Sequence, residues 1–185
     1  MELIATVVRL QVQRSRLKAL PAKVYDPAPL HQVPALEVGV RGCRGLLPDG
    51  TVLLDVHHAN HPDTRQRRGA NGVSLLTLAG YRRLRQAHGG HLVDGVAGES
   101  LLLDGELPVD GELVVETDGG RLPLVDLLPA PPCVEFTRFC LGRDGGPVDD
   151  DVRAALEALG GGARGCYATA VGTGVVRPGA RVWRA

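Results

Sequence analysis

The sequence predicts a mixed α/β fold dominated by β-strands, arranged as a closed or partly open β-barrel with a few peripheral helices. Gly and Pro supply 25 and 13 of the 185 residues, which favours many turns over a helical bundle. Short runs of β-branched and aliphatic residues recur along the chain, whereas two segments have the periodicity and caps of helices. Closure into a barrel would leave the fewest exposed strand edges.

The composition indicates a single domain spanning residues 1–185. A chain of this length removes roughly 70% of its unfolded surface from water, so it needs no disulfides to fold. Its 21 basic and 21 acidic residues balance, which disfavours a dedicated nucleic-acid binder because such proteins neutralise phosphates. The sequence shows no signal peptide and no apolar run near the roughly 18 residues of a membrane span. We therefore expect a cytoplasmic protein that binds neither nucleic acid nor membrane, of undefined oligomeric state.

Strand-like runs occupy the first part of the chain. Residues 2–12 are rich in aliphatic and β-branched types, and residues 33–40 alternate weakly before a Gly-rich turn at 42–50. A buried strand is expected at 51–56 and a short strand at 73–76. The polar stretch between these two strands is rich in His and Arg and predicts a long loop.

Two helices follow from caps and apolar periodicity. Thr77 is a candidate N-cap for a helix at 78–88, which Gly89 ends. Asp149 or Asp150 would cap a second helix at 149–159. One face of the first helix would carry Leu78, Tyr81, Leu84 and His88, and the apolar stripe of the second would consist of Val152, Leu156 and Leu159.

Further strand-like runs surround these helices and are separated by Asp-Gly and Gly-Gly turns. They lie at 91–93, 100–103, 112–117, 121–127, 166–171 and 180–183. Arg177-Pro178-Gly179 is a turn signal between the last two of them. No internal repeat or interdomain linker interrupts the series.

The four cysteines form no C-x-x-C pair, which argues against a zinc ribbon, a thioredoxin motif or an iron–sulfur ligand set. Cys133 follows two prolines, so we expect it at a rigid strand end. A thiol held there suits a metal ligand or a sulfur carrier, and the alternative is a small buried apolar residue. Cys43, Cys140 and Cys166 are expected to be packing residues, with a resolving role for Cys140 as a lesser alternative.

Several motifs occur in a fixed order. Gly98-Glu99-Ser100-Leu101 is followed by Pro131-Pro132-Cys133 and by the closing Gly174-Val175-Val176-Arg177-Pro178-Gly179. This order resembles the MOSC family, which is named after the C-terminal domain of molybdenum cofactor sulfurases. Asp55-Val56-His57 is similar to a G-D-R-H segment of that family, and the resemblance covers residues 33 to 183.

The sequence departs from the family pattern at several positions. Leu54 replaces the Gly of G-D-R-H and Val56 replaces its Arg. Ser100 replaces the Asn of a G-E-N-L turn, and Ala180 replaces the Asp of the closing hairpin. The fold inference is less sensitive to these changes than the ligand inference.

The resemblance implies a MOSC-type β-barrel in which Cys133 is the functional thiol. In amidoxime-reducing relatives the equivalent cysteine ligates the molybdenum of a molybdopterin cofactor, and in sulfurases the domain receives or presents sulfur for that metal. Both roles suit a thiolate, which is a soft ligand and a competent persulfide carrier. By the same resemblance, Asp55, His57, Glu99 and Ser100 would lie near the cofactor.

The loop at 57–68 contains three arginines and three histidines. Arg65, Arg67 and Arg68 could hold the cofactor's phosphate through forked hydrogen bonds, in the same cleft as His57 and Cys133. The histidines could instead bind zinc, although their spacing is not that of a helical H-E-x-x-H site. The third alternative is a solvated polar loop.

These features leave three functional hypotheses. The first is a molybdenum cofactor protein that reduces N-hydroxylated or related small molecules, with electrons from a separate donor protein because the chain has no flavin, nicotinamide or ferredoxin motif. The second is a sulfur carrier served by a separate sulfur donor. The third is a MOSC-like barrel that has lost its cofactor. Pyridoxal phosphate catalysis is disfavoured, because Lys18 and Lys23, the only lysines, lie outside the motifs.

Overall fold

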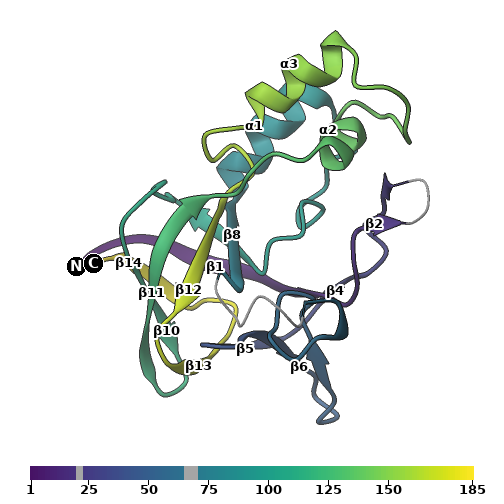
Figure 1. Ribbon diagram of the computed structural model, residues 1–185. Helices are drawn as coiled ribbons and strands as arrows, with labels where there is room; N and C mark the ends of the chain where they lie inside the picture. Colours follow the sequence, from purple (N-terminus) through teal and green to yellow (C-terminus); the bar gives the residue numbers. More distant parts are fainter. Residues whose placement is uncertain (20–22, 65–70) are drawn as a thin grey trace.

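The protein folds around a closed barrel of seven strands, which confirms the predicted fold class. The computed structural model describes residues 1–19, 23–64 and 71–185. The long first strand, β1, pairs with β14 on one side and with β9 on the other and so closes the sheet (Figure 1). Around the barrel the strands are β1 (Glu2–Gln13), β14 (Arg181–Arg184), β10 (Leu113–Thr117), β11 (Gly120–Pro129), β12 (Cys166–Ala170), β8 (Val73–Thr77) and β9 (Leu101–Gly105). The pair β8–β9 is parallel and the other pairs are antiparallel.

A second, four-stranded sheet lies against one side of the barrel, in the lower part of Figure 1. Its order is β13 (Thr173–Val176), β5 (Ala35–Gly39), β6 (Gly42–Leu46) and β7 (Val52–Leu54). The short strand β4 (Leu30–Gln32) pairs with the end of β1, and β2 (Lys18–Ala19) pairs with β3 (Val24–Tyr25). A single 3-10 turn, η1, spans Pro62–Thr64.

The strand β6 occupies part of the segment for which the sequence predicts a turn. A β-carbon on Gly45 would lie 2.7 Å from Val33 Cγ1 and 3.3 Å from Val12 Cγ1, so this glycine allows β6 to approach β1 and its neighbour closely. The glycines that indicated a turn therefore serve close packing of a strand.

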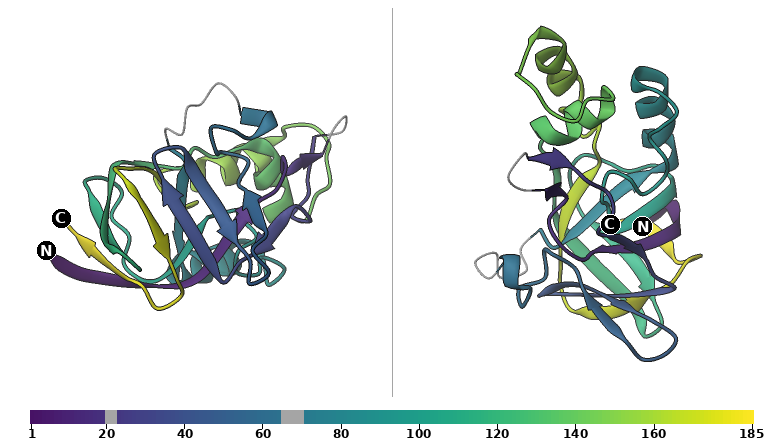
Figure 2. Two further views of the ribbon diagram at one scale, coloured as in Figure 1. Left: turned by 90° about the horizontal axis from the view of Figure 1, so that it is seen from below. Right: turned by 90° about the vertical axis from the view of Figure 1, so that its right-hand side faces the viewer.

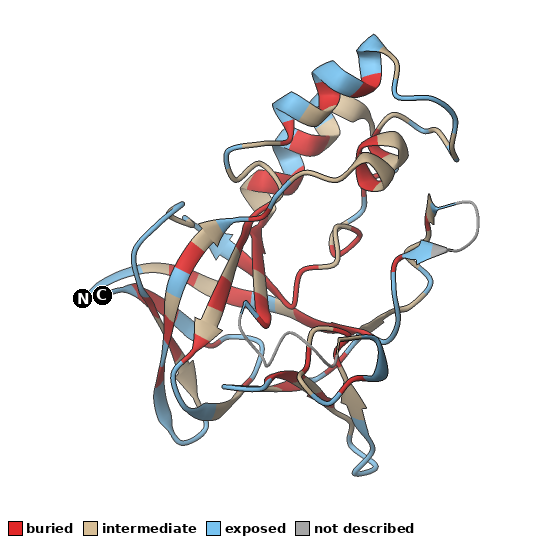
Figure 3. Cartoon of the chain, viewed as in Figure 1, coloured by how far each residue is buried: buried red, intermediate tan, exposed pale blue. Residues whose placement is uncertain are grey.

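The barrel core is aliphatic because alternate residues of each strand point inward. Val7, Leu10, Leu101, Leu124 and Val182 belong to it and are fully buried. Leu36, Val38 and Val176 of the smaller sheet belong to the same cluster, so the two sheets share one core. In Figure 3, buried residues accordingly occur at intervals along the strands, as in β11 and β12.

A second core lies between the barrel and three helices at one end of the molecule (Figure 2, right). The helices are α1 (Leu78–His88), α2 (Val134–Cys140) and α3 (Asp150–Ala158). The strands β8 and β9 serve both cores, because Leu75 and Leu101 face the barrel core whereas Leu76 and Leu102 face the helices. This second core also takes Tyr81, Phe136 and Leu159, with β3 contributing Tyr25.

The helices α1 and α3 confirm the two predicted helices. Thr77 caps α1 by accepting a hydrogen bond from Gly80 N at 2.9 Å, and Asp149 caps α3 by accepting one from Val152 N at 3.0 Å. The strand expected at 91–93 was wrong. That segment makes local turn hydrogen bonds, which carry the side chain of Leu92 into the helical core.

The expected strand end at Cys133 was also wrong. Strand β11 ends at Pro129, and Cys133 is the residue directly before α2. The helix forms because Phe136 is buried completely and packs edge-on against Tyr25, with ring centroids 5.1 Å apart. Among the described residues, no helix is both long enough and apolar enough to cross a membrane.

Candidate functional site

A cleft of about 570 Å³ lies where residues of the barrel meet residues of the helical core. Its volume is within the range of small-molecule sites. Three predicted site residues, His57, Glu99 and Cys133, line it. The other residues that line it are Gln13, Arg16, Leu17, Lys18, Tyr25, Val56, Asp63, Thr64, Ser74, Ala97, Gly98, Ala130, Pro131, Pro132, Arg164, Cys166 and Tyr167.

Cys133 is the half-buried thiol of this cleft. Two prolines and the short α2 fix the backbone on either side of it, and its carbonyl accepts hydrogen bonds from Thr137 N at 2.9 Å and Thr137 Oγ1 at 2.8 Å. The thiol is therefore held in place at a concave surface, as a ligand or carrier thiol must be.

The other three cysteines are buried. Cys43 belongs to the barrel core and Cys140 to the helical core. Burial raises the pKa of the Cys140 thiol to about 12 and that of the Cys166 thiol to about 11. Cys166 also lines the cleft, but it is only 2% exposed. These thiols remain protonated at neutral pH, whereas nucleophilic attack and metal ligation need the thiolate.

Glu99 brings a buried carboxyl group to the cleft. The residue is 4% exposed, and its Oε2 accepts a hydrogen bond from Tyr81 Oη at 2.7 Å. Its Oε1 is buried and has no hydrogen-bond partner among the described residues. Burial raises the pKa of Glu99 to about 7, because removing the carboxylate from water disfavours its charged form. At neutral pH this group can therefore either give or take a proton.

His57 is oriented by the buried Asp55. The Oδ1 atom of Asp55 lies 2.9 Å from His57 Nδ1 and also accepts a hydrogen bond from His57 N at 2.8 Å. Asp55 Oδ2 accepts a further bond from Gln13 N at 2.7 Å. Because a carboxylate only accepts, the neutral imidazole carries its hydrogen on Nδ1 and keeps the Nε2 lone pair for a ligand.

Two further predicted residues lie behind the cleft wall. Asp55 is 1% exposed and acts on the cleft through His57. Ser100 is 2% exposed, and its hydroxyl lies 3.1 Å from that of Ser74, which does line the cleft. Arg65, Arg67 and Arg68, expected to bind phosphate, lie outside the described residues.

The histidines of the 57–68 segment do not converge. His58 Nδ1 accepts from Asn60 N at 3.1 Å, and His61 Nδ1 accepts from Asp63 N at 3.2 Å. Both rings thus serve local turns, and burial lowers the pKa of His58. Within the described part of the chain, no group of three His, Cys, Asp or Glu side chains could hold a metal ion, so the zinc alternative gains no support.

Sequence reasoning missed several residues that the fold brings to the cleft, chiefly Arg164. It lies in a Gly-rich segment that reads as a linker between elements. Its Nη1 donates to Pro131 O at 3.0 Å, and its guanidinium carbon lies 4.4 Å from the Phe136 ring centroid. Only the pairing of β11 with β12 sets these residues side by side, so no sequence signal near Arg164 could have found it.

The comparisons with known proteins support the fold alone. No family model matches the sequence, and no curated protein matches it. Among solved structures, the chain is similar to the YUAD protein from Bacillus subtilis, with a TM-score of 0.59 at 12% identity over 96% of this chain and 93% of that one. The chain is also similar to the crystal structure of a hypothetical protein, with a TM-score of 0.58 at 12% identity over 97% of this chain and 68% of that one.

Proposed function

We propose that the cleft holds a molybdenum–pterin cofactor, with Cys133 as the thiolate ligand that the protein supplies to the metal. The observation that carries this proposal is the position of Cys133: it is the one half-buried thiol among four, and it lies on the wall of a cleft of ligand size. The order of the Glu99, Cys133 and closing-hairpin motifs, which resembles the MOSC family, supports the same assignment.

The donor set of the cleft fits such a group. The described residues offer no cluster that could bind a metal by itself. A metal that arrives with an organic chelator needs few protein ligands, and a single thiolate is a soft ligand suited to it. The unpartnered Glu99 Oε1 can accept an N–H of the organic part. Arg16 and Arg164 line the same cleft and can bind an anionic part.

The protein's own residues would bind, orient and exchange protons. When bound, the cofactor would supply a two-electron oxygen-transfer chemistry suited to N-hydroxylated small molecules, with electrons from a separate donor protein. His57 Nε2 can take up a proton at the cleft while Asp55 holds Nδ1. Glu99 can exchange a proton at Oε1, since burial raises its pKa to about 7.

Sulfur carriage by Cys133 is the second candidate. A persulfide persists on a cysteine when no second thiolate attacks it. Cys140, seven positions further on, is buried, and its pKa is raised to about 12, so its thiol is not available as a thiolate at neutral pH. This isolation of Cys133 favours a carrier that hands its sulfur to another protein.

The experiment is a measurement of molybdenum and sulfane sulfur in protein purified from a molybdopterin-competent host. We expect near-stoichiometric molybdenum in the wild type, its loss in Cys133→Ser, and its retention in Cys166→Ser. The last variant is the matched control, because Cys166 lies on the wall of the same cleft but is only 2% exposed, whereas Cys133 is half-buried. Sulfane sulfur confined to Cys133 would favour the carrier. If neither appears in folded protein, both functions are excluded and the barrel lacks a cofactor.

A further inference from the structure

We propose that Arg164 is the anion-binding residue beside Cys133, and that it holds the oxyanion group of the molecule that meets this thiol. The proposal rests on the proposed function in one respect, since it takes Cys133 as the reacting thiol. The ligand class is a tetrahedral oxyanion, such as a phosphate ester or thiosulfate. Both have the charge and geometry that a guanidinium fork matches.

The fold holds Arg164 by contacts with the residues that precede and follow Cys133 in the chain. Its Nη1 donates to the carbonyl of Pro131, two residues before Cys133, at 3.0 Å. Its guanidinium carbon lies 4.4 Å from the ring centroid of Phe136, three residues after Cys133. A guanidinium held over a ring face is attracted to the ring and still has its N–H groups as hydrogen-bond donors. Arg164 is therefore positioned with respect to the thiol although it is distant in sequence.

The guanidinium of Arg164 has no ion-pair partner and has a donor without a hydrogen bond among the described residues. No carboxylate forms an ion pair with it in the described part of the chain, and residues 20–22 and 65–70 contain no Asp or Glu. Its Nε is buried without a hydrogen-bond partner among the described residues. By contrast Lys18, on the same cleft, is paired with Glu135 at 3.0 Å. A cation left without a counter-charge in a partly enclosed cleft is costly, and a bound anion would repay that cost.

The charge of Arg164 acts on the groups around the thiol. Burial raises the pKa of Cys140 to about 12, and the positive charge of Arg164 opposes this rise. Burial likewise raises the pKa of Tyr25, and the positive charge of Arg164 opposes that rise. Tyr25 also lines the cleft, so the field of Arg164 reaches the space in front of Cys133.

The test compares alkylation of Cys133 by iodoacetate and by iodoacetamide, mapped by peptide mass spectrometry, in protein from a host that makes no molybdopterin, so that no metal occupies the thiol. In both reactions the thiolate sulfur attacks the CH₂ carbon and iodide leaves. The ratio of the two rates therefore cancels any change in the thiolate fraction and isolates the charge of the reagent. We expect Arg164→Gln to lower the iodoacetate-to-iodoacetamide ratio about fivefold, the factor for one unit charge at about 4 Å in water.

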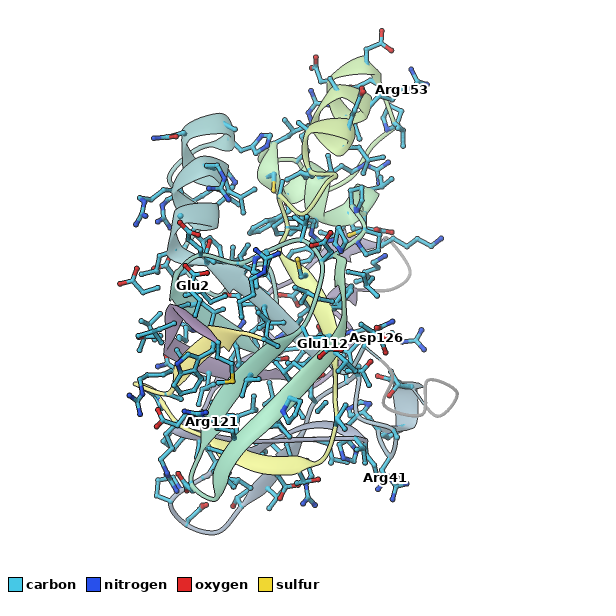
Figure 4. The ribbon with its side chains drawn as sticks, turned by 90° about the vertical axis from the view of Figure 1, so that its left-hand side faces the viewer. Glu2, Arg41, Glu112, Arg121, Asp126 and Arg153 are labelled. Atoms are coloured by element: carbon cyan, nitrogen blue, oxygen red, sulfur yellow. The ribbon has the colours of Figure 1, made fainter. Side chains whose placement is uncertain are left out.

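Arg153→Gln is the matched control. Arg153 lies on the outer surface of α3, away from the barrel (Figure 4), where it pairs with Asp150 at 2.7 Å. This change removes the same charge from the protein and should leave the ratio unchanged. Arg164→Lys should keep most of the ratio, because it retains the charge.

If Arg164→Gln does not fold, the wild-type ratio must still fall with rising salt, which screens the charge of Arg164, and with added phosphate, which occupies the site.

Two ligand arms separate the sources of the oxyanion. Phosphate should slow the alkylation of Cys133 without changing the protein. Thiosulfate should slow it too, and in addition the Cys133 thiolate can attack its outer sulfur, so that the S–S bond breaks, sulfite leaves and a persulfide forms. Formation of sulfane sulfur then identifies a sulfur donor, and protection alone identifies a phosphate-bearing ligand.

The outcomes distinguish this inference from the proposed function. An unchanged ratio in Arg164→Gln, with no effect of phosphate or salt on the wild type, would overturn the anion site while leaving Cys133 as the functional thiol. Failure of both reagents to label Cys133 in folded wild-type protein from a host that makes no molybdopterin would instead overturn the proposed function itself, because the thiol would then be inaccessible even without a cofactor.

Discussion

Glu99 combines the two costs that a buried acid incurs, desolvation of its charge and an oxygen without a partner. Burial raises its pKa from about 4.5 to about 7, so the folded protein binds a proton that the unfolded chain has released between these values. We predict that the free energy of unfolding decreases as pH rises from about 4.5 to about 7 and that Glu99→Gln removes this decrease. The contribution is up to about 3 kcal/mol, the equivalent of the pKa difference.

Urea unfolding at a series of pH values measures this effect. Stability contributed by protonated Glu99 is fully present below its unfolded pKa and is lost as pH rises through the folded pKa. The variant retains an acceptor for Tyr81 Oη, so its fold should persist. Parallel pH profiles for wild type and Glu99→Gln would show that folding does not raise the pKa of Glu99, against this account.

At the level of single residues, the sequence predicted part of the candidate site. Motif order brought out Cys133, Glu99 and His57, and all three line the cleft. Motif order could not distinguish residues that face the cleft from residues behind its wall. Asp55, for example, is buried where it accepts a hydrogen bond from Gln13 N of β1, a strand that is distant in sequence. Arg164 escaped notice because its partners are set by strand pairing.

Capping residues and apolar periodicity define the helices α1 and α3, which pack on the helical core. For α1, Thr77 Oγ1 accepts from Gly80 N, and Thr77 is 5% exposed. We predict that Thr77→Ala lowers the free energy of unfolding by about 1 kcal/mol, because one end of the helix loses its capping acceptor. Thr77→Ser keeps the hydroxyl and should cost less in the same urea titration. Equal losses in both variants would assign the effect to the missing methyl group.

Local sequence predicted the helices with strong caps but not the elements formed by packing. The helices α1 and α3 were predicted with bounds within one residue. By contrast α2 contains β-branched and aromatic residues that favour strands, and it becomes helical because Phe136 packs on Tyr25. In β13, a β-carbon on Gly174 would lie 2.6 Å from Thr117 Cγ2, so a residue that signals a turn permits close strand packing.

Across the whole molecule, strands β8 and β9 join the two cores and should make unfolding cooperative. Trp183, the single tryptophan, reports on the barrel from β14, and far-UV circular dichroism also reports on the three helices. We predict coincident urea transitions by tryptophan fluorescence and by circular dichroism at 222 nm (a helix-weighted wavelength). Loss of the helical signal at lower urea than the fluorescence change would show that the helical core unfolds separately.

The neighbours Leu101 and Leu102 test the same coupling from each side. Leu101 is buried in the barrel core and Leu102 in the helical core. Each change to Ala should cost about 2–5 kcal/mol, the range for removal of a buried leucine side chain. Both variants should shift the two spectroscopic transitions together. A Leu102→Ala protein in which the fluorescence midpoint does not move would mean that the cores are independent.

The central claim, that Cys133 is the working thiol of the cleft, is tested most directly by the order in which the four cysteines react in the native protein. Limited alkylation with iodoacetamide, followed by peptide mapping, measures this order in folded protein from a host that makes no molybdopterin, where no metal occupies Cys133. Cys133 is half-buried on the cleft, whereas Cys43, Cys140 and Cys166 are buried, with pKa values raised by burial. We expect Cys133 to be labelled first, with the other three protected until the protein unfolds. Labelling of Cys140 or Cys166 ahead of Cys133 would contradict the account.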